Sequence, residues 1–153
     1  LFSNEVGNHP GCTHCHSSSN QLFTSNEYEN NGLDSVGLDM SDLNNFMDWG
    51  LGEVTNDIFV NGKFRIPSLR NVEITGPYMH DGRFANLDQV IDHYSRGIQP
   101  HPHLDKNLMV TGGSAPVRLN LTQEEKDALV AFLRTLTDVS FITDKKFSDP
   151  FAN

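Results

Sequence analysis

Cysteines and long hydrophobic runs are scarce in this sequence of 153 residues. No cysteine other than Cys12 and Cys15 occurs, and a structural disulfide that encloses only two residues is uncommon. No run of about 18 apolar residues exists, so no segment is long enough to span a bilayer. Hydrophobic residues make up 37% of the chain, which is enough for a core but leaves room for long loops.

Basic residues are also few. The 11 lysines and arginines stand against 20 aspartates and glutamates, which gives a net charge of -9. This balance argues against nucleic acid or an anionic membrane as the main partner. The chain shows no signal peptide and begins abruptly with Leu1 and Phe2, so we expect it to be a mature product or a fragment.

The two cysteines belong to a C-x-x-C-H motif, which runs from Cys12 to His16. Two thiols at this spacing bind both vinyl groups of a haem through thioethers, and the histidine binds the iron from one face. The motif therefore predicts one covalent haem c. His14 lies inside the motif, where side chains usually face solvent, so we do not expect it to be a ligand.

Two other interpretations of the motif are weaker. A redox pair of the thioredoxin type lies at the start of a helix after a buried strand, and no βαβ pattern surrounds Cys12. A structural zinc site could use Cys12 and Cys15, but the histidines that would complete it lack tight ligand spacing.

The remaining pattern predicts helices separated by irregular segments. Asn86 is a candidate cap for a helix whose apolar face carries Leu87, Val90, Ile91 and Tyr94 and which ends at Gly97. A capping box at Thr122 starts the clearest helix, whose predicted buried stripe contains Ala128, Leu129, Phe132, Leu133 and Leu136. We therefore expect an all-α, cytochrome c-like fold with long irregular loops, forming a single haem domain over residues 1–153.

The sequence alone does not decide which residue is the second iron ligand. Tyr94 lies near the centre of an apolar stripe, whereas His93 is rotated away from it, outward or to the side. Met79 and Met109 lie in loops and are the alternative ligands. A packed core role for Tyr94 is the competing interpretation.

The stretch from Phe64 to Gly82, FRIPSLRNVEITGPYMHDG, resembles the signature of bacterial di-haem cytochrome c peroxidases and their MauG-type relatives. The similarity continues through Leu87 to Tyr94 and through Leu119 to Asp138. With the haem motif it covers nearly the whole chain, and it is confined to the C-terminal half of such proteins.

This resemblance implies roles for further residues. It implies that Tyr94 binds the iron opposite His16, because MauG-type proteins have a tyrosine where typical peroxidases have a methionine. It also implies a calcium ion held partly by the backbone carbonyls of Thr75 and Pro77. Arg70 would neutralise a haem propionate, and His80 would donate a hydrogen bond near it.

The resemblance further implies an electron-relay domain in the periplasm. Electrons would come from a small cytochrome or cupredoxin and pass to a peroxidatic haem in an N-terminal domain of the same protein, where hydrogen peroxide is reduced to water. We expect the present domain alone to have little activity. The alternatives are a stand-alone electron-carrier cytochrome c and a MauG-like enzyme that oxidises protein side chains.

Overall fold

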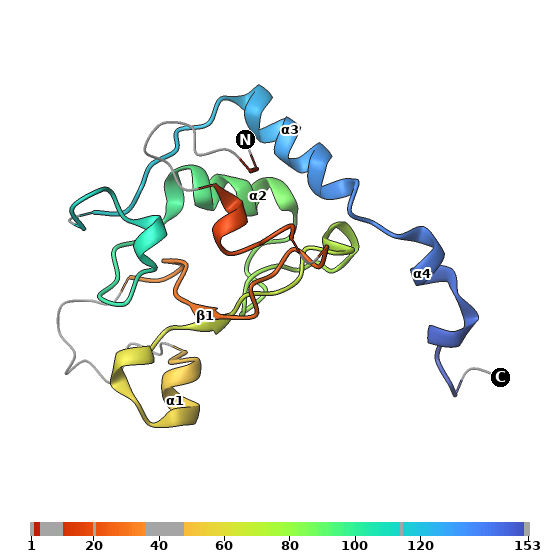
Figure 1. The fold of residues 1–153 in the computed structure, drawn as a ribbon, viewed down its shortest axis with the longest axis horizontal. Coiled ribbons are helices and arrows are strands. Elements are labelled where there is room, and N and C mark those ends of the chain that lie inside the picture. The colour runs from red at the N-terminus through yellow and green to blue at the C-terminus, as the bar shows by residue number, and fades with distance from the viewer. Residues whose placement is uncertain (1, 4–10, 20, 36–47, 114, 152–153) are drawn as a thin grey trace.

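Short helices joined by long loops make up the computed structural model (Figure 1). It describes residues 2–3, 11–19, 21–35, 48–113 and 115–151. The α-helices are α1 (Leu51–Thr55), α2 (Leu87–Asp92), α3 (Gln123–Arg134) and α4 (Val139–Thr143). The single-turn helices are η1 (Cys12–His14), η2 (Ile58–Val60), η3 (Val72–Ile74), η4 (His93–Gly97), η5 (Lys106–Leu108) and η6 (Lys145–Phe147). Strands β1 (Tyr28–Glu29) and β2 (Phe64–Arg65) form a short antiparallel pair.

The predicted all-α class therefore holds in outline, since helices predominate and strands are few and short. Tyr28 pairs with Arg65 and Glu29 with Phe64. Helix α1 and strand β1 were not predicted from the sequence. Within the described parts of the chain, no helix is long and apolar enough to cross a membrane.

Helices α2 and α3 pack against each other and form the core. The buried side chains of this core are Leu87 and Ile91 from α2, with Leu129, Val130, Leu133 and Leu136 from α3 and its end. An ion pair between Lys126 Nζ and Asp92 Oδ1, 2.8 Å long, joins the two helices at the surface. Burying this apolar set fixes α2, and with it the turn that carries Tyr94.

Both predicted helix caps are present. The Asn86 side chain accepts a hydrogen bond from the Gln89 N–H at the start of α2. At α3, Thr122 and Glu125 form the complete capping box, in which each side chain accepts from the backbone N–H of the other residue. Of the predicted stripe on α3, Ala128 is exposed, and Val130 is buried in its place.

Helix α2 does not continue regularly through Tyr94. It ends at Asp92 and passes into η4, a π-helical turn from His93 to Gly97. A π turn contains more residues than an α turn, so it changes the direction of the side chains that follow. Of the two directions expected for His93, the outward one is wrong, because only 5% of its surface is exposed.

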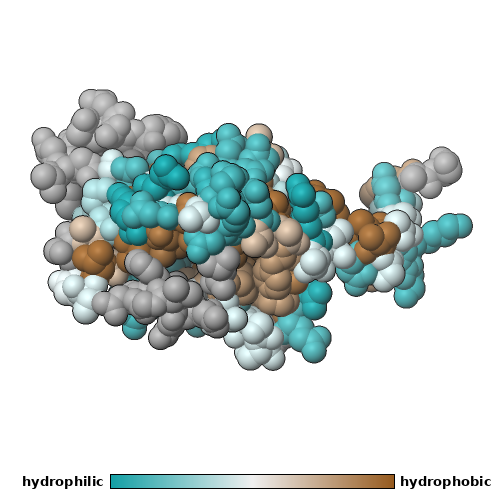
Figure 2. Space-filling view, turned by 90° about the horizontal axis from the view of Figure 1, so that it is seen from above, coloured by the Kyte–Doolittle hydropathy of each residue, from teal (hydrophilic) through white to brown (hydrophobic). Residues whose placement is uncertain are grey.

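The C-terminal segment extends away from the body as an arm, defined here as residues 139–151 (Figure 1). It contains α4 and η6, which contact each other. Several large apolar side chains of the arm are exposed, namely Val139, Phe141, Ile142, Phe147 and Phe151. Figure 2 shows hydrophobic residues on this projection, beyond the mostly hydrophilic surface of the body.

Two minor expectations lie outside the described residues. The sequence predicts a solvated loop rather than a calcium-binding loop from Asp39 to Asn44, and Ser41 is a candidate cap for a short helix. Residues 36–47 are not described.

Candidate haem site

The C-x-x-C-H motif forms a tight turn. Residues Cys12–His14 are the 3-10 turn η1, and the His16 N–H donates to the Cys12 carbonyl at 2.9 Å. Residues three apart in a 3-10 turn eclipse each other, so Cys12 and Cys15 lie on the same side. His14 is exposed on this turn, as expected. This is the local geometry that attachment to two vinyl groups of one haem requires.

His16 is oriented by the loop that follows it. Its Nδ1 donates a hydrogen bond to the Phe23 carbonyl oxygen, with 3.1 Å between the two atoms. Burial lowers the pKa of His16, although the carbonyls of Phe23 and Pro67 oppose this effect. A neutral ring with its proton on Nδ1 leaves the lone pair of Nε2 available to iron.

Phe23 connects this histidine to the core. Its ring contacts Phe2 at 6.0 Å and Phe132 of α3 at 6.1 Å between centroids. The Phe2 and Phe132 rings lie 4.7 Å apart. The carbonyl that orients His16 therefore belongs to a residue held by the packing of α3.

Both thiols are free and partly buried. Burial raises the pKa of Cys12, and burial together with the carboxylates of Asp105 and Glu29 raises the pKa of Cys15 to about 12. The thiols are thus protonated at neutral pH. Low-pKa redox cysteines show the opposite behaviour, so these values do not favour a thioredoxin-type pair.

Tyr94 lies close to the two cysteines. Burial raises the pKa of its hydroxyl to about 12, a hydrogen bond with the Asn31 side chain lowers it, and the Cys15 and Cys12 thiols raise it. Tyr94 also contacts the His93 ring edge to face, with centroids 5.1 Å apart. The structure therefore brings the predicted ligand Tyr94 to the side of the chain that carries the haem motif.

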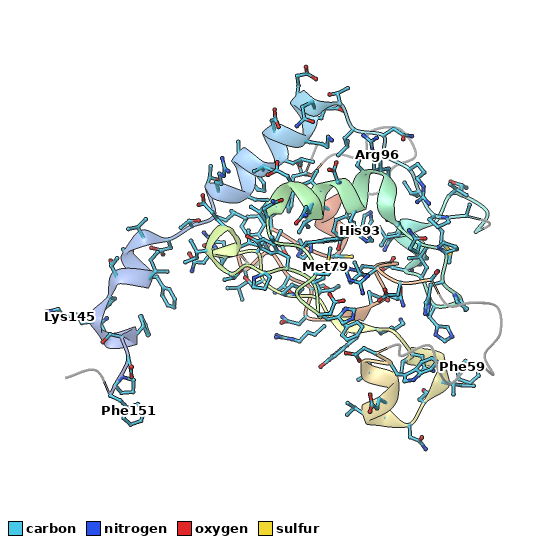
Figure 3. All side chains as sticks on the ribbon, turned by 180° about the vertical axis from the view of Figure 1, so that it is seen from behind. Phe59, Met79, His93, Arg96, Lys145 and Phe151 are labelled. Atoms are coloured by element: carbon cyan, nitrogen blue, oxygen red, sulfur yellow. The ribbon has the colours of Figure 1, made fainter. Side chains whose placement is uncertain are left out.

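Met79 and His93 meet the same neighbour, Asn31. The Asn31 Nδ2 donates to Met79 Sδ at 3.4 Å, and His93 Nε2 donates to the Asn31 carbonyl at 3.0 Å. Figure 3 shows Met79 and His93 close together beneath α2. Met109 lies in another loop, where its backbone pairs with Pro116.

The two predicted propionate contacts are exposed. Arg70 lies over the Phe23 ring, 5.6 Å from its centroid, and its Nε donates to the Gln21 carbonyl at 2.7 Å. Its guanidinium is thus next to the loop that orients His16. His80 stacks on Phe64 with centroids 3.8 Å apart.

Thr75 and Pro77, the predicted calcium carbonyls, lie in an exposed turn after η3. The Thr75 hydroxyl donates to the Val72 carbonyl at 3.1 Å. Over the described residues, no group of three or more His, Cys, Asp or Glu side chains is arranged to hold a metal ion. A site made of backbone carbonyls does not depend on such a group, so the calcium assignment stays a prediction.

The residues present fit a covalent haem. The two protonated thiols lie on one side of a turn, a neutral histidine has its Nε2 lone pair available, and a phenol lies close to the thiols. Cys12, Cys15 and His16 would hold the group, and Tyr94 stays a predicted ligand. A bound haem supplies one-electron chemistry at iron.

Sequence reasoning missed two residues of this site. The sequence pattern assigned no role to Asn31 or to Phe23. Neither shows a periodic or motif signal, because each acts through an amide or a carbonyl. The adjacent asparagines before glycine were the available hint, since such side chains often bond the nearby backbone.

These features define a helical domain built to carry a c-type haem. No family model matches the chain. The methylamine utilization protein MauG of Paracoccus denitrificans is 35% identical over 151 residues, which cover 83% of this chain and 39% of that protein. The cytochrome-c peroxidase IdrP1 of a Pseudomonas species is 39% identical over 97 residues, which cover 60% of this chain and 22% of that protein.

Solved structures of MauG-like proteins and diheme peroxidases are also similar to this chain. A MauG-like protein associated with microbial copper homeostasis is 40% identical, with a TM-score of 0.67 over 92% of this chain and 46% of that one. The diheme peroxidase BthA of Burkholderia thailandensis is 25% identical, with a TM-score of 0.63 over 86% of this chain and 40% of that one. The chain is thus a homologue of MauG and di-haem cytochrome c peroxidases and corresponds to their C-terminal portion. It spans less than half the length of these relatives.

Proposed function

We propose that residues 1–153 form the electron-relay haem c domain of a periplasmic di-haem peroxidase. The observation that carries this proposal is the convergence of Tyr94 and the Cys12–His16 motif on one site. The relatives named above are peroxidases and MauG proteins about twice as long or longer. In the proposal, the N-terminal part of the same protein carries the peroxidatic haem, and a small cytochrome or cupredoxin donates electrons.

The residues of this chain bind and orient rather than transfer protons. Cys12 and Cys15 fix the haem covalently, and the Phe23 carbonyl holds His16 in the tautomer that binds iron. Tyr94 would hold the haem iron through its phenol oxygen, and an oxygen ligand would favour the ferric state. Reduction of peroxide needs an open iron position and an acid-base group, which we place in the N-terminal domain.

Three further roles belong to the proposal. Arg70 neutralises a haem propionate, and His80 donates a hydrogen bond near it. Thr75 and Pro77 bind calcium through their carbonyls, together with a ligand from the N-terminal domain.

The ligand assignment is tested with Tyr94→Phe. We expect this substitution to change the ferric absorption and electron paramagnetic resonance spectra of the haem-loaded domain, because a ligand atom is lost. Met109→Ala is the comparison and should leave both spectra as they are. Unchanged spectra in Tyr94→Phe together with altered spectra in Met109→Ala would transfer the role to Met109.

Peroxide turnover tests the proposed assignment of electron relay to this domain and of peroxide reduction to the N-terminal domain. The reduced domain alone should turn over hydrogen peroxide far more slowly than a two-haem enzyme, since His16 and Tyr94 together would leave no open iron position for peroxide. A comparable steady-state rate would refute the relay role. Mass spectrometry of the native protein separates this proposal from a stand-alone carrier, because a longer chain with a second C-x-x-C-H motif excludes the carrier.

A second candidate function is MauG-like oxidation of protein side chains. The observation that favours it is Tyr94 itself, together with the 35% identity to MauG. It also requires the N-terminal haem. Formation of an oxidised, cross-linked protein substrate by the full-length protein with peroxide would support this function over simple peroxide removal.

A further inference from the structure

Large apolar side chains are exposed together on one small lobe, defined here as residues 48–63. Val54 of α1 is 84% exposed, and Ile58 and Phe59 of η2 are 58% and 74% exposed. Helices α1 and η2 contact each other, so these side chains lie within one small region of the surface, called here the apolar patch. Single exposed apolar residues are ordinary, whereas a group of them indicates a contact surface.

The lobe is held in shape by backbone hydrogen bonds and a side-chain cap. At its base, the Leu51 N–H donates to the Lys63 carbonyl at 2.9 Å. Gly50 has φ +54, and a Cβ there would clash with the same carbonyl oxygen, so this close approach requires glycine. At the start of η2, the Phe59 N–H donates to Asp57 Oδ1 at 2.9 Å. The backbone that carries Phe59 is therefore ordered before a partner binds, which lowers the entropy cost of binding.

The charged residues around the patch are mostly acidic. Asp48, Glu53 and Asp57 are the acidic residues of the lobe, and all are exposed. Lys63 is its one basic residue, and its Nζ lies 2.9 Å from Glu29 Oε2, so that charge is paired. The patch thus has an acidic rim, on a chain whose net charge is -9. Such a surface attracts a basic partner and repels an acidic one.

The position of the lobe distinguishes an external partner from the proposed N-terminal domain. The Phe2 ring contacts the Phe132 ring of α3, with centroids 4.7 Å apart, so a domain that precedes this residue would join the chain beside α3. Figure 1 shows α1 at the edge of the body opposite α3, and Figure 3 places Phe59 at that edge. This separation favours a partner that arrives from solution.

The lobe is connected to the segment that orients His16. Strand β2 leads from the lobe to Ile66, whose carbonyl accepts from the Thr24 hydroxyl at 2.7 Å. Thr24 follows Phe23, and the Phe23 carbonyl accepts the hydrogen bond from His16 Nδ1. A partner on the lobe would therefore bind to a part of the chain that leads directly to the haem motif.

From these features we propose that the apolar patch and its acidic rim form the docking surface for a small basic electron-donor protein. The contact face of that donor is apolar at its centre and surrounded by lysines. In the complex the donor is oxidised by one electron, the ferric haem c of this chain is reduced by it, and no atoms are exchanged. This inference rests on the proposed haem-relay function and specifies where the donor binds.

The test titrates the isotope-labelled, haem-loaded chain with a basic mitochondrial cytochrome c and follows the amide signals by nuclear magnetic resonance at low ionic strength. Signals from residues 51–60 should shift. Phe59→Ala should raise the Kd by on the order of tenfold, because an aromatic anchor is removed. Phe151→Ala is the matched control, since Phe151 is 89% exposed but lies on the arm, and it should keep the Kd of the parent.

Charge variants test the acidic rim. Glu53→Gln should raise the Kd by about twofold and reduce its dependence on salt. Glu124→Gln, at the exposed start of α3, is the control and should change neither. The same cytochrome with acetylated lysines should bind weakly to every variant, because acetylation removes the positive charge. Equal binding of the native and the acetylated cytochrome would contradict a basic partner.

Two results would overturn the docking surface. One is an equal Kd for the parent and Phe59→Ala. The other is an effect of Phe59→Ala in this domain that is absent from the full-length protein, because the N-terminal domain would then cover the patch.

Stopped-flow mixing of the dithionite-reduced chain with the ferric cytochrome separates this inference from the relay function, since transfer in this direction uses the same complex. If the parent exchanges no electrons with the cytochrome, the relay function is refuted. If the parent and Phe59→Ala exchange electrons at equal rates, only the docking surface is refuted.

Discussion

At the scale of single residues, the orientation of His16 and of His93 is fixed by a hydrogen bond from one ring nitrogen to a backbone carbonyl. His16 donates from Nδ1 to the Phe23 carbonyl, whereas His93 donates from Nε2 to the Asn31 carbonyl. His101 differs, since its Nδ1 accepts from the His103 N–H at 3.0 Å. The proton of the neutral His101 ring is then on Nε2, which is buried and has no hydrogen-bond partner among the residues that the structure describes.

Gly62 lies next to this nitrogen. Gly62 has φ +72, and a Cβ on it would lie 2.5 Å from the Asn30 Nδ2 and 3.1 Å from the His101 Nε2. The glycine thus permits the loop to approach His101 closely. Burial lowers the pKa of His101 to about 4, the neighbouring His103 acts in the same direction, and Asp34 opposes it.

This pKa predicts acid sensitivity. The unfolded chain binds a proton at His101 below about pH 6.5, whereas the folded chain does so only near pH 4, so stability is complete above pH 6.5 and falls as the pH drops toward 4. His101 should account for a loss of up to about 3 kcal/mol in the free energy of unfolding across this window. Urea unfolding at several pH values measures this loss.

The matched variants are His101→Asn and His103→Asn. His101→Asn keeps an acceptor near the position of Nδ1 and should flatten the pH dependence, while His103→Asn should retain the steep dependence of the parent. Equal slopes for the parent and His101→Asn between pH 4 and 6.5 would contradict the assignment.

At the scale of elements, α3 has the strongest local signal. Its capping box satisfies two N–H groups at the helix start, and its buried side chains support α2. Removing the Thr122 oxygen with Thr122→Ala should lower the free energy of unfolding by about 1 kcal/mol. Thr122→Ser keeps the oxygen and should lose much less, and thermal unfolding of both variants compares them. A similar loss in both variants would argue against the cap as the cause.

Helices with a local capping signal could be predicted from the sequence, whereas the site residues that depend on distant contacts could not. Caps and apolar spacing depend on neighbours a few residues away, so Asn86, Thr122 and the inward side of α2 were identified correctly. The π turn at His93 and the amide of Asn31 depend on contacts across 62 residues, for which the sequence contains no local signal. The Cys12–His16 motif was identifiable because its chemistry requires a fixed spacing.

At the scale of the whole molecule, the body and the arm of residues 139–151 differ in how they are held. Among the described residues, the last backbone hydrogen bond from this end of the chain to the body comes from the Asp138 N–H, which donates to Asn71 Oδ1 at 2.7 Å. It lies next to the bond from the Asn71 N–H to the Leu136 carbonyl at 3.0 Å. Beyond this point, the Phe141 and Phe147 rings contact each other with centroids 4.6 Å apart. The arm is therefore stabilised mainly by its own local contacts.

Removing residues 139–153 tests this separation. The free energy of unfolding of the haem-loaded domain should change by less than about 1 kcal/mol, because the arm's large apolar side chains are already exposed and lose little burial. Leu133→Ala is the positive control, since it deletes a buried side chain between α2 and α3 and should cost about 2–5 kcal/mol. Urea unfolding measures both. If the truncated chain is as unstable as Leu133→Ala, the arm packs on the body in solution. If the urea midpoint of the truncated chain is unchanged, the apolar side chains of the arm are free to contact another protein surface.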